Sequence, residues 1–467
     1  MKTLKFIILT IFTLSFFSCS EDIMDEINKE RNDSENMPAA NILPSVIAQS
    51  AFESTGTDLA WYATVYCEHS AGTWGQSVNA DRRIGQNDAS LANNSWNNIY
   101  YVMLECKTII DKTDPTSGSE PDNFWARGIA QVLLAYNLAI TTDMWGDVPY
   151  SEALQGAINV YPKYDSQESV YTAIFALLDD AIVNLGKTTV KFGANDYIYK
   201  GDQNKWIKAA YSLKARYAMR LSNKKSDAAA TALAAISKGF ASATDALVFA
   251  SFEATATGEN PWRQFMADRS HLSVGSTLYN LMNERNDPRM ALLFTKISGN
   301  YSPAPVGEAL QTQGGVYSVS LVSESNRIAP VPLMSYHEFK FIEAEAKFRA
   351  GDATWKDALK AAVTASFAYT KATEGTYFAD VVEPRLTAGN ELNEILTQKY
   401  IAMYEYEAME AYNDYRRTNI PAMKNPNNST ASGGFVHRFP YALSEVSSNG
   451  ANVPSVDVFK DKVWWAK

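Results

Sequence analysis

Apolar residues recur every three or four positions along most of this chain, and this periodicity limits the fold more than any other feature. The clearest stretch runs from Leu392 to Tyr415, where apolar residues fall on one side and charged residues such as Glu394 and Lys399 on the other. Such a stripe predicts a helix with one buried face. Similar spacing predicts further helices over residues 43–68, 92–112, 123–142, 167–185, 206–222, 226–239, 274–285, 336–349 and 355–369.

Several of the predicted helices come in pairs. Tyr336–Ala350 and Trp355–Tyr369 flank a Gly351-Asp352 turn, and together they have about the ~34-residue length of a tetratricopeptide repeat. The pattern predicts an all-α fold of tetratricopeptide-like helical hairpins, with short β-hairpins around Gly315–Val322. Long loops are expected where proline, glycine and small polar residues gather, at 70–90, 186–204, 255–273, 298–330 and 419–456.

The start of the chain carries an export signal. Lys2 and Lys5 precede an apolar and hydroxyl run from Phe6 to Phe17, which is shorter than the ~20 residues that span a bilayer. The Ser18-Cys19 step that follows resembles a bacterial lipobox. It implies that residues 1–18 are removed and that Cys19 is acylated. The polar and charged composition up to about Pro38 predicts a flexible stalk over 19–38, and the folded domain is expected over 39–467. The acidic residues after Cys19 resemble a signal for export to the cell exterior.

Composition argues against several classes of function. The net charge is −10 and no cluster of lysine and arginine occurs, so nucleic acid is excluded as a partner. No motif for a zinc site or another cofactor appears, since His337-Glu338 lacks the second histidine of H-E-x-x-H. Cys67 and Cys106 could form a disulfide or remain as two buried thiols, and their spacing does not decide between these.

Several blocks of sequence point to a known family. Trp145–Ala153 reads W-G-D-V-P-Y-S-E-A and resembles the signature of SusD/RagB-type outer-membrane nutrient-binding lipoproteins. Trp206–Leu221, Glu343–Ala346 and Tyr404–Pro421 look like later blocks of that family. The ending, with Arg438–Tyr441 and then Val463-Trp464-Trp465, resembles the subgroup called SusD-like.

This resemblance implies a helical ligand-binding scaffold that acts as a lid on a SusC-like TonB-dependent transporter in the outer membrane. The ligand would be an oligosaccharide or, in some members, a peptide, and the only membrane attachment would be the lipid. The motif residues themselves are expected to be architectural. Asp147 and Pro149 suit a helix stop and turn, because aspartate caps free N–H groups and proline fixes φ.

Two loop tryptophans are the candidate ligand contacts, because sugars pack their C–H faces on exposed aromatic rings beside polar groups. Trp74 lies between glycines, with Gln76 and Asn79 close by. Trp262 follows a proline that is expected to break a helix. It is flanked by Asn260 and Arg263. The alternative for both tryptophans is that they plug the edge of the core. Other tryptophans lie at helical spacing and are expected in the core: Trp61, Trp96, Trp125, Trp206 and Trp355.

The two alternative functions are a surface glycoside hydrolase and a scaffold for protein interactions. Hydrolysis needs two facing carboxylates. The close pairs, Asp179/Asp180, Glu343/Glu345 and Glu405/Glu407, lie on predicted helices, where adjacent or alternate side chains point apart. A pure scaffold would leave Trp74 and Trp262 unexplained. The sequence therefore favours ligand capture without catalysis.

Overall fold

The structure is a computed structural model that describes residues 37–405, 407–426 and 434–467. The predicted signal peptide, the lipidation site at Cys19 and nearly all of the predicted stalk lie outside these residues. No helix in the described part of the chain is long and apolar enough to cross a membrane.

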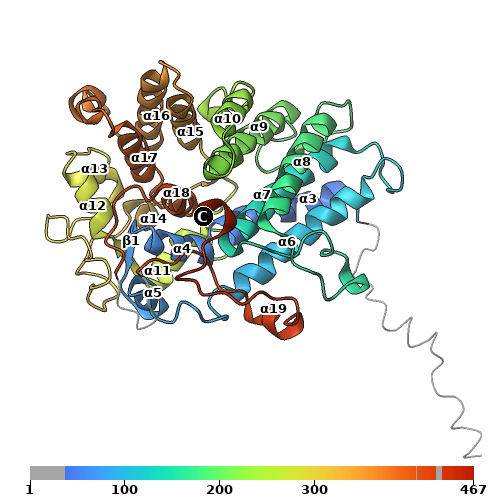
Figure 1. Ribbon diagram of the computed structural model, residues 1–467, viewed down its shortest axis with the longest axis horizontal. Coiled ribbons are helices and arrows are strands. Elements are labelled where there is room, and N and C mark those ends of the chain that lie inside the picture. The colour runs from blue at the N-terminus through green and yellow to red at the C-terminus, as the bar shows by residue number, and fades with distance from the viewer. Residues whose placement is uncertain (1–36, 406, 427–433) are drawn as a thin grey trace, which may run out of the picture.

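Helices dominate the described chain (Figure 1). In chain order they are α3 (Ala39–Gln49), α4 (Asp58–Tyr66), α5 (Gly75–Asp81), α6 (Asn93–Lys112), α7 (Phe124–Trp145), α8 (Gln167–Leu185), α9 (Gln203–Arg220), α10 (Ala228–Ile236), α11 (Pro261–Arg269), α12 (Ser276–Asn283), α13 (Met290–Leu293), α14 (Leu321–Ser325), α15 (Tyr336–Arg349), α16 (Trp355–Thr370), α17 (Glu391–Ala402), α18 (Ala408–Thr418) and α19 (Leu443–Ser448). The all-α prediction is confirmed.

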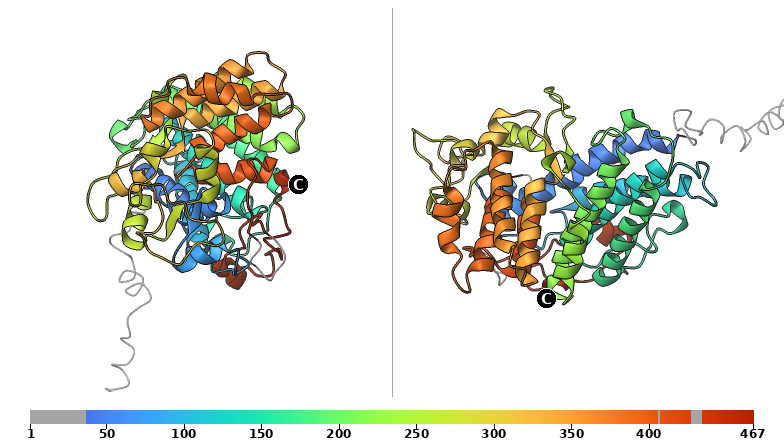
Figure 2. Two further views of the ribbon diagram at one scale, coloured as in Figure 1. Left: turned by 90° about the vertical axis from the view of Figure 1, so that its left-hand side faces the viewer. Right: turned by 90° about the horizontal axis from the view of Figure 1, so that it is seen from above.

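Helical hairpins form one layer of the molecule. Helices α6, α7, α8, α9 and α10 pack each against the next, α10 contacts α15, and α15 pairs with α16. Seen from above, these helices stand side by side in a row, with the first described helix crossing at one end (Figure 2). Small residues let the helices approach closely; an added Cβ at Gly128 of α7 would lie 2.5 Å from the Leu185 side chain of α8.

Two of the predicted helices are broken in the structure. Residues 43–68 form α3, a π-helical turn (Ser50–Thr55) and α4, with a break at Gly56. The stretch 392–415 is divided into α17 and α18 by a turn in which Glu405 has a φ of 78°, a value that helical residues do not adopt. Periodicity persists across both breaks because the apolar residues on each side of the break are buried.

The β-structure is small, and most of it lies elsewhere than predicted. The strands of the described residues form two-stranded antiparallel sheets: β1 (Ser70–Gly72) with β3 (Leu272–Val274), and β2 (Leu247–Phe249) with β4 (Val331–Met334). Residues 315–322 make only an isolated bridge between Phe294 and Ser320. Each sheet joins segments far apart in sequence, and β1–β3 positions the site described below.

The Trp145–Ala153 motif is architectural, as expected. Trp145 is fully buried and its indole N–H donates to the carbonyl of Pro440 over 2.9 Å. The Asp147 carboxylate accepts the backbone N–H of Gln167, the first residue of α8, over 2.8 Å. The motif thus joins the end of α7 to the start of α8 and to the C-terminal segment.

Cys67 and Cys106 are buried free thiols, which settles the choice left open by the sequence. Burial raises the pKa of Cys67 to about 12. Neither thiol is therefore a nucleophile near neutral pH.

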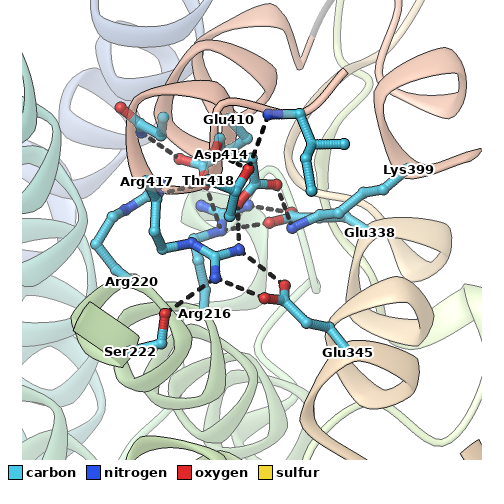
Figure 3. A network of polar contacts seen from close by, with 12 residues as sticks. Arg216, Arg220, Ser222, Glu338, Glu345, Lys399, Glu410, Asp414, Arg417 and Thr418 are labelled. Carbon is cyan, nitrogen blue, oxygen red and sulfur yellow. Dashed lines mark hydrogen bonds and ion pairs between the residues drawn. The ribbon is translucent and has the colours of Figure 1, made fainter. Parts of the chain in front are cut away.

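A network of buried ion pairs connects α9, α15, α17 and α18 (Figure 3). Arg417 donates to Glu345 and to Asp414, and Lys399 pairs with Asp414 at 2.7 Å. Arg216 pairs with Glu338, so that Glu345 and Glu338 each hold an arginine from another helix. Glu345 is therefore held in a structural ion pair, and Glu343 pairs with Lys340 and Lys347 of its own helix.

Candidate functional site

The site lies beside the β1–β3 sheet, where a cavity of about 530 Å³ opens between α4, α5 and α11. Its residues come from segments that are distant in sequence. They are Phe52, Thr57, Asp58, Trp61, Gln76, Ser90, Leu91, Asn94, Pro261, Gln264, Phe265, Asp268, Arg269 and His271. The volume is within the range of small-molecule sites, about 300–1,000 Å³.

Stacked aromatic rings form one wall of the cavity. The ring centroids of Trp61 on α4 and Phe265 on α11 are 3.9 Å apart, with an interplanar angle of 19°. His271 packs edge-on against Phe265 at 5.7 Å. This wall is an apolar surface of the kind on which the C–H face of a sugar ring, or an aromatic side chain, can lie.

The β1–β3 pairing sets the position of His271. The backbone N–H of Thr73, which follows β1, donates to the carbonyl of His271 over 2.8 Å. Gly75 then turns the chain into α5 with a φ of 55°, and an added Cβ there would lie 2.8 Å from the His271 ring. Glycine is needed at this position for both the turn and the close approach.

Acidic, basic and neutral polar side chains surround the aromatic wall. Burial and the neighbouring Glu53 raise the pKa of Asp58. Partial burial and the nearby Arg269 lower the pKa of His271, so its imidazole is neutral at neutral pH. Gln76 and Asp268 are exposed and offer an amide and a carboxylate to a ligand. An aromatic wall with convergent hydrogen-bonding groups is suited to a polar ligand with apolar faces.

Of the predicted ligand contacts Trp74, Gln76 and Asn79, the structure places only one in the lining of this cavity. Gln76 lines the cavity. Trp74 is 38% exposed, as expected, at the start of α5, but neither it nor Asn79 is among the lining residues. A ligand larger than the cavity would be needed to reach Trp74.

The other predicted contacts, Asn260, Trp262 and Arg263, lie outside the cavity lining, and the prediction that Trp262 is exposed is wrong. Trp262 is only 2% exposed, because Pro261 begins helix α11 instead of breaking a helix. Asn260 is fully buried as the N-cap: its side-chain oxygen accepts the N–H of Arg263 over 3.0 Å, and its amide donates to Ala329 over 2.8 Å. Arg263 is half-buried and does not line the cavity.

Trp61 is the main residue that the sequence missed. It was expected in the core, but it is half-buried and faces the cavity, whereas Trp96, Trp125 and Trp206 are buried as expected. Helical spacing gives no signal for this difference. Helical spacing indicates which face of a helix is turned toward the rest of the protein, and that face can line a cavity as well as pack in the core.

Among the described residues, no group of three or more His, Cys, Asp or Glu side chains is placed to hold a metal ion. The cavity does contain two carboxylates, Asp58 and Asp268, which were not among the close pairs considered from the sequence.

Comparison with known proteins agrees with the fold. A family model named SusD-like, described as "Starch-binding associating with outer membrane", matches residues 34–442. A SusD/RagB family protein from Bacteroides thetaiotaomicron is 34% identical, with a TM-score of 0.84 over 92% of this chain and 99% of that one. No curated protein sequence matches the chain.

More distant structures share the fold alone. A chitin-binding SusD homologue from Flavobacterium johnsoniae is 22% identical, with a TM-score of 0.76 over 91% of this chain and 99% of that one. A SusD-like protein from Bacteroides thetaiotaomicron is 23% identical, with a TM-score of 0.77 over 92% and 98% of the two chains.

Proposed function

The chain belongs to the SusD-like family, and on this premise we propose that it captures an oligosaccharide at the cell surface without turning it over. The cavity walled by the Trp61–Phe265 stack is the observation that carries this proposal. A sugar ring would stack on the wall while Gln76 and the charged groups bond its hydroxyls. The affinity expected for so few contacts lies between about micromolar and millimolar.

The captured ligand is then delivered to a SusC-like TonB-dependent transporter, on which the protein acts as a lid. Acylation of Cys19 keeps the protein on the outer membrane, facing the cell exterior, and residues 19–38 act as the tether. A tether of this kind raises the effective concentration of the lid beside its transporter. The family supports this arrangement, and co-purification of the transporter with the acylated protein tests it.

Ligand binding is tested with a glycan and peptide array probed with the purified chain lacking residues 1–19. Trp61→Ala removes the stacking wall and should lower a glycan signal at least tenfold. Tyr101→Ala, at a tyrosine that is 55% exposed on α6 outside the cavity, is the matched control and should leave it unchanged. An unchanged signal with Trp61→Ala would overturn the assigned site.

The same array separates the alternatives. A peptide signal that depends on Trp61 would make the protein a peptide-binding member of the same system. Glycoside hydrolysis is the second alternative because Asp58 and Asp268 line one cavity and Asp58 has a raised pKa, as a general acid requires. Release of reducing ends that is abolished by Asp58→Asn would establish catalysis and reject capture alone.

A further inference from the structure

A second cavity, of about 490 Å³, lies between helices α13 and α14 on one side and the C-terminal ends of α16 and α17 on the other. It shares no lining residue with the candidate site. These helices lie together on the left of Figure 1. Two of its lining residues, Tyr404 and Glu405, begin the sequence block Tyr404–Pro421.

The walls of the second cavity are largely apolar. Leu292, Leu293, Val322, Ile401 and Tyr369 contribute to them. Leu292 is 40% exposed and Tyr369 is 43% exposed, so apolar surface is left open to solvent at this position. Exposed apolar surface inside a cavity of this size is typical of a site for a small ligand with an apolar body.

Among the described residues, the charged groups of the lining are Arg289, Glu405 and Lys371. Arg289 is 1% exposed and its guanidinium is held by Asp287 and Ser366. Glu405 is buried and engaged within the protein.

Of these described lining charges, Lys371 remains available to a ligand. It is the C-cap that follows α16, in the left-handed conformation with a φ of 60°, and it is exposed. Within the described residues its ammonium forms no salt bridge. A positive charge at the mouth of an apolar cavity is complementary to an amphipathic anion.

We propose that this cavity binds a small amphipathic anion, with an apolar ring body against Tyr369 and Leu292 and a carboxylate beside Lys371. The volume accommodates a molecule of one to three fused rings and is too small for a folded partner or a long peptide. The two cavities share no lining residue, so we expect this ligand to bind without displacing a glycan from the first site.

The test uses 2-naphthoate as the probe, with 2-naphthalenemethanol and 2-naphthylmethylamine as neutral and cationic analogues of the same body. Titrations are followed by ligand-observed NMR on the purified chain lacking residues 1–19. We expect saturable binding of 2-naphthoate with a dissociation constant of about 0.1–1 mM, weaker binding of the alcohol and the weakest binding of the amine.

Variants separate the roles of the body and the head group. Tyr369→Ala should weaken the acid and the alcohol alike by about tenfold, which corresponds to one lost aromatic contact. Lys371→Gln should weaken only the acid, by about two- to fivefold, as for an exposed charge pair. Lys462→Gln, at an exposed lysine outside the cavity, and Trp61→Ala should change neither.

Absence of saturable 2-naphthoate binding, or binding unaffected by Tyr369→Ala, would overturn the proposed cavity. Binding of the amine more tightly than the acid would overturn the assignment of an anionic ligand. Far-UV circular dichroism of each variant shows whether the fold is retained. If Tyr369→Ala fails to fold, Leu292→Ala at the exposed side of the cavity replaces it with the same expectation.

Discussion

Trp61 and Phe265 stack face to face, 3.9 Å apart between ring centroids, although one belongs to α4 and the other to α11. Strand β1 follows α4 in the chain and strand β3 follows α11, and these two strands pair with each other. The β1–β3 pairing therefore helps to hold together the two helices that form the aromatic wall.

Replacing Phe265 should weaken glycan binding, because Phe265 holds the Trp61 ring in place. Phe265→Ala removes the ring that supports the indole, so we expect glycan affinity to fall about fivefold to tenfold, as for one lost aromatic contact. Isothermal titration with the best glycan of the array measures it. Phe265→Tyr keeps a ring in place and should retain most of the affinity; equal losses in both variants would contradict the stacking role.

Gly75→Ala should be more harmful than Gly85→Ala. Both glycines have positive φ, 55° and 69°, so each substitution carries backbone strain of about 1 kcal/mol. Only at Gly75 would the new Cβ press on the His271 ring, at 2.8 Å, since nothing lies within 4 Å at Gly85. Urea unfolding and glycan binding of the two variants give the comparison, and equal effects would show that the close approach is unimportant.

Asp81 should make stability depend on pH. It is 1% exposed, and burial, opposed by Arg83, raises its pKa from 3.8 to about 7. Between these values the folded chain keeps a proton that the unfolded chain has lost, so this contribution to stability is complete below pH ~4 and falls as the pH rises to 7.

Asp81→Asn removes that titration. The free energy of unfolding of the variant minus that of the unchanged protein should therefore rise by up to about 4 kcal/mol between pH 4 and pH 8. Urea unfolding at several pH values measures the difference, with Asp88→Asn as a control because Asp88 is exposed. A difference that is constant with pH would argue against a raised pKa.

Breaking the buried pair of Arg417 and Glu345 should be costly. The side chains are 1% and 0% exposed, and Glu345→Gln removes one of the two carboxylates that hold Arg417, leaving Asp414. We expect a loss of about 2–3 kcal/mol in the free energy of unfolding, as for a buried hydrogen bond between charged groups. Asp111→Asn, which breaks an exposed pair with Lys107, should cost less than about 1 kcal/mol in the same measurement.

Cys67 and Cys106 should be unreactive in the folded protein. Both thiols are buried, and burial raises the pKa of each. Iodoacetamide at pH 8 should modify neither in the native chain lacking residues 1–19, and both after unfolding without a reductant. Intact-mass analysis checks this, and a failure to react after unfolding would indicate a disulfide.

Much of the architecture could be predicted because it depends on local pattern. The periods over 167–185, 336–349 and 355–369 gave helices whose ends agree closely with α8, α15 and α16. The breaks at Gly56 and Glu405 were missed because the helices on either side bury their apolar residues in one core, so the stripe continues without a signal.

Periodicity along the chain was enough to predict the helical class, and the motif blocks were enough to predict the family. Which aromatic residues face solvent or a cavity depends on the tertiary structure, as the difference between Trp74 and Trp262 shows. Trp61 and Trp262 are both helical tryptophans, yet only Trp61 lines the candidate site. The physical reason is that a cavity wall is made by packing between distant segments, and spacing along one helix contains no information about the segment that packs against it.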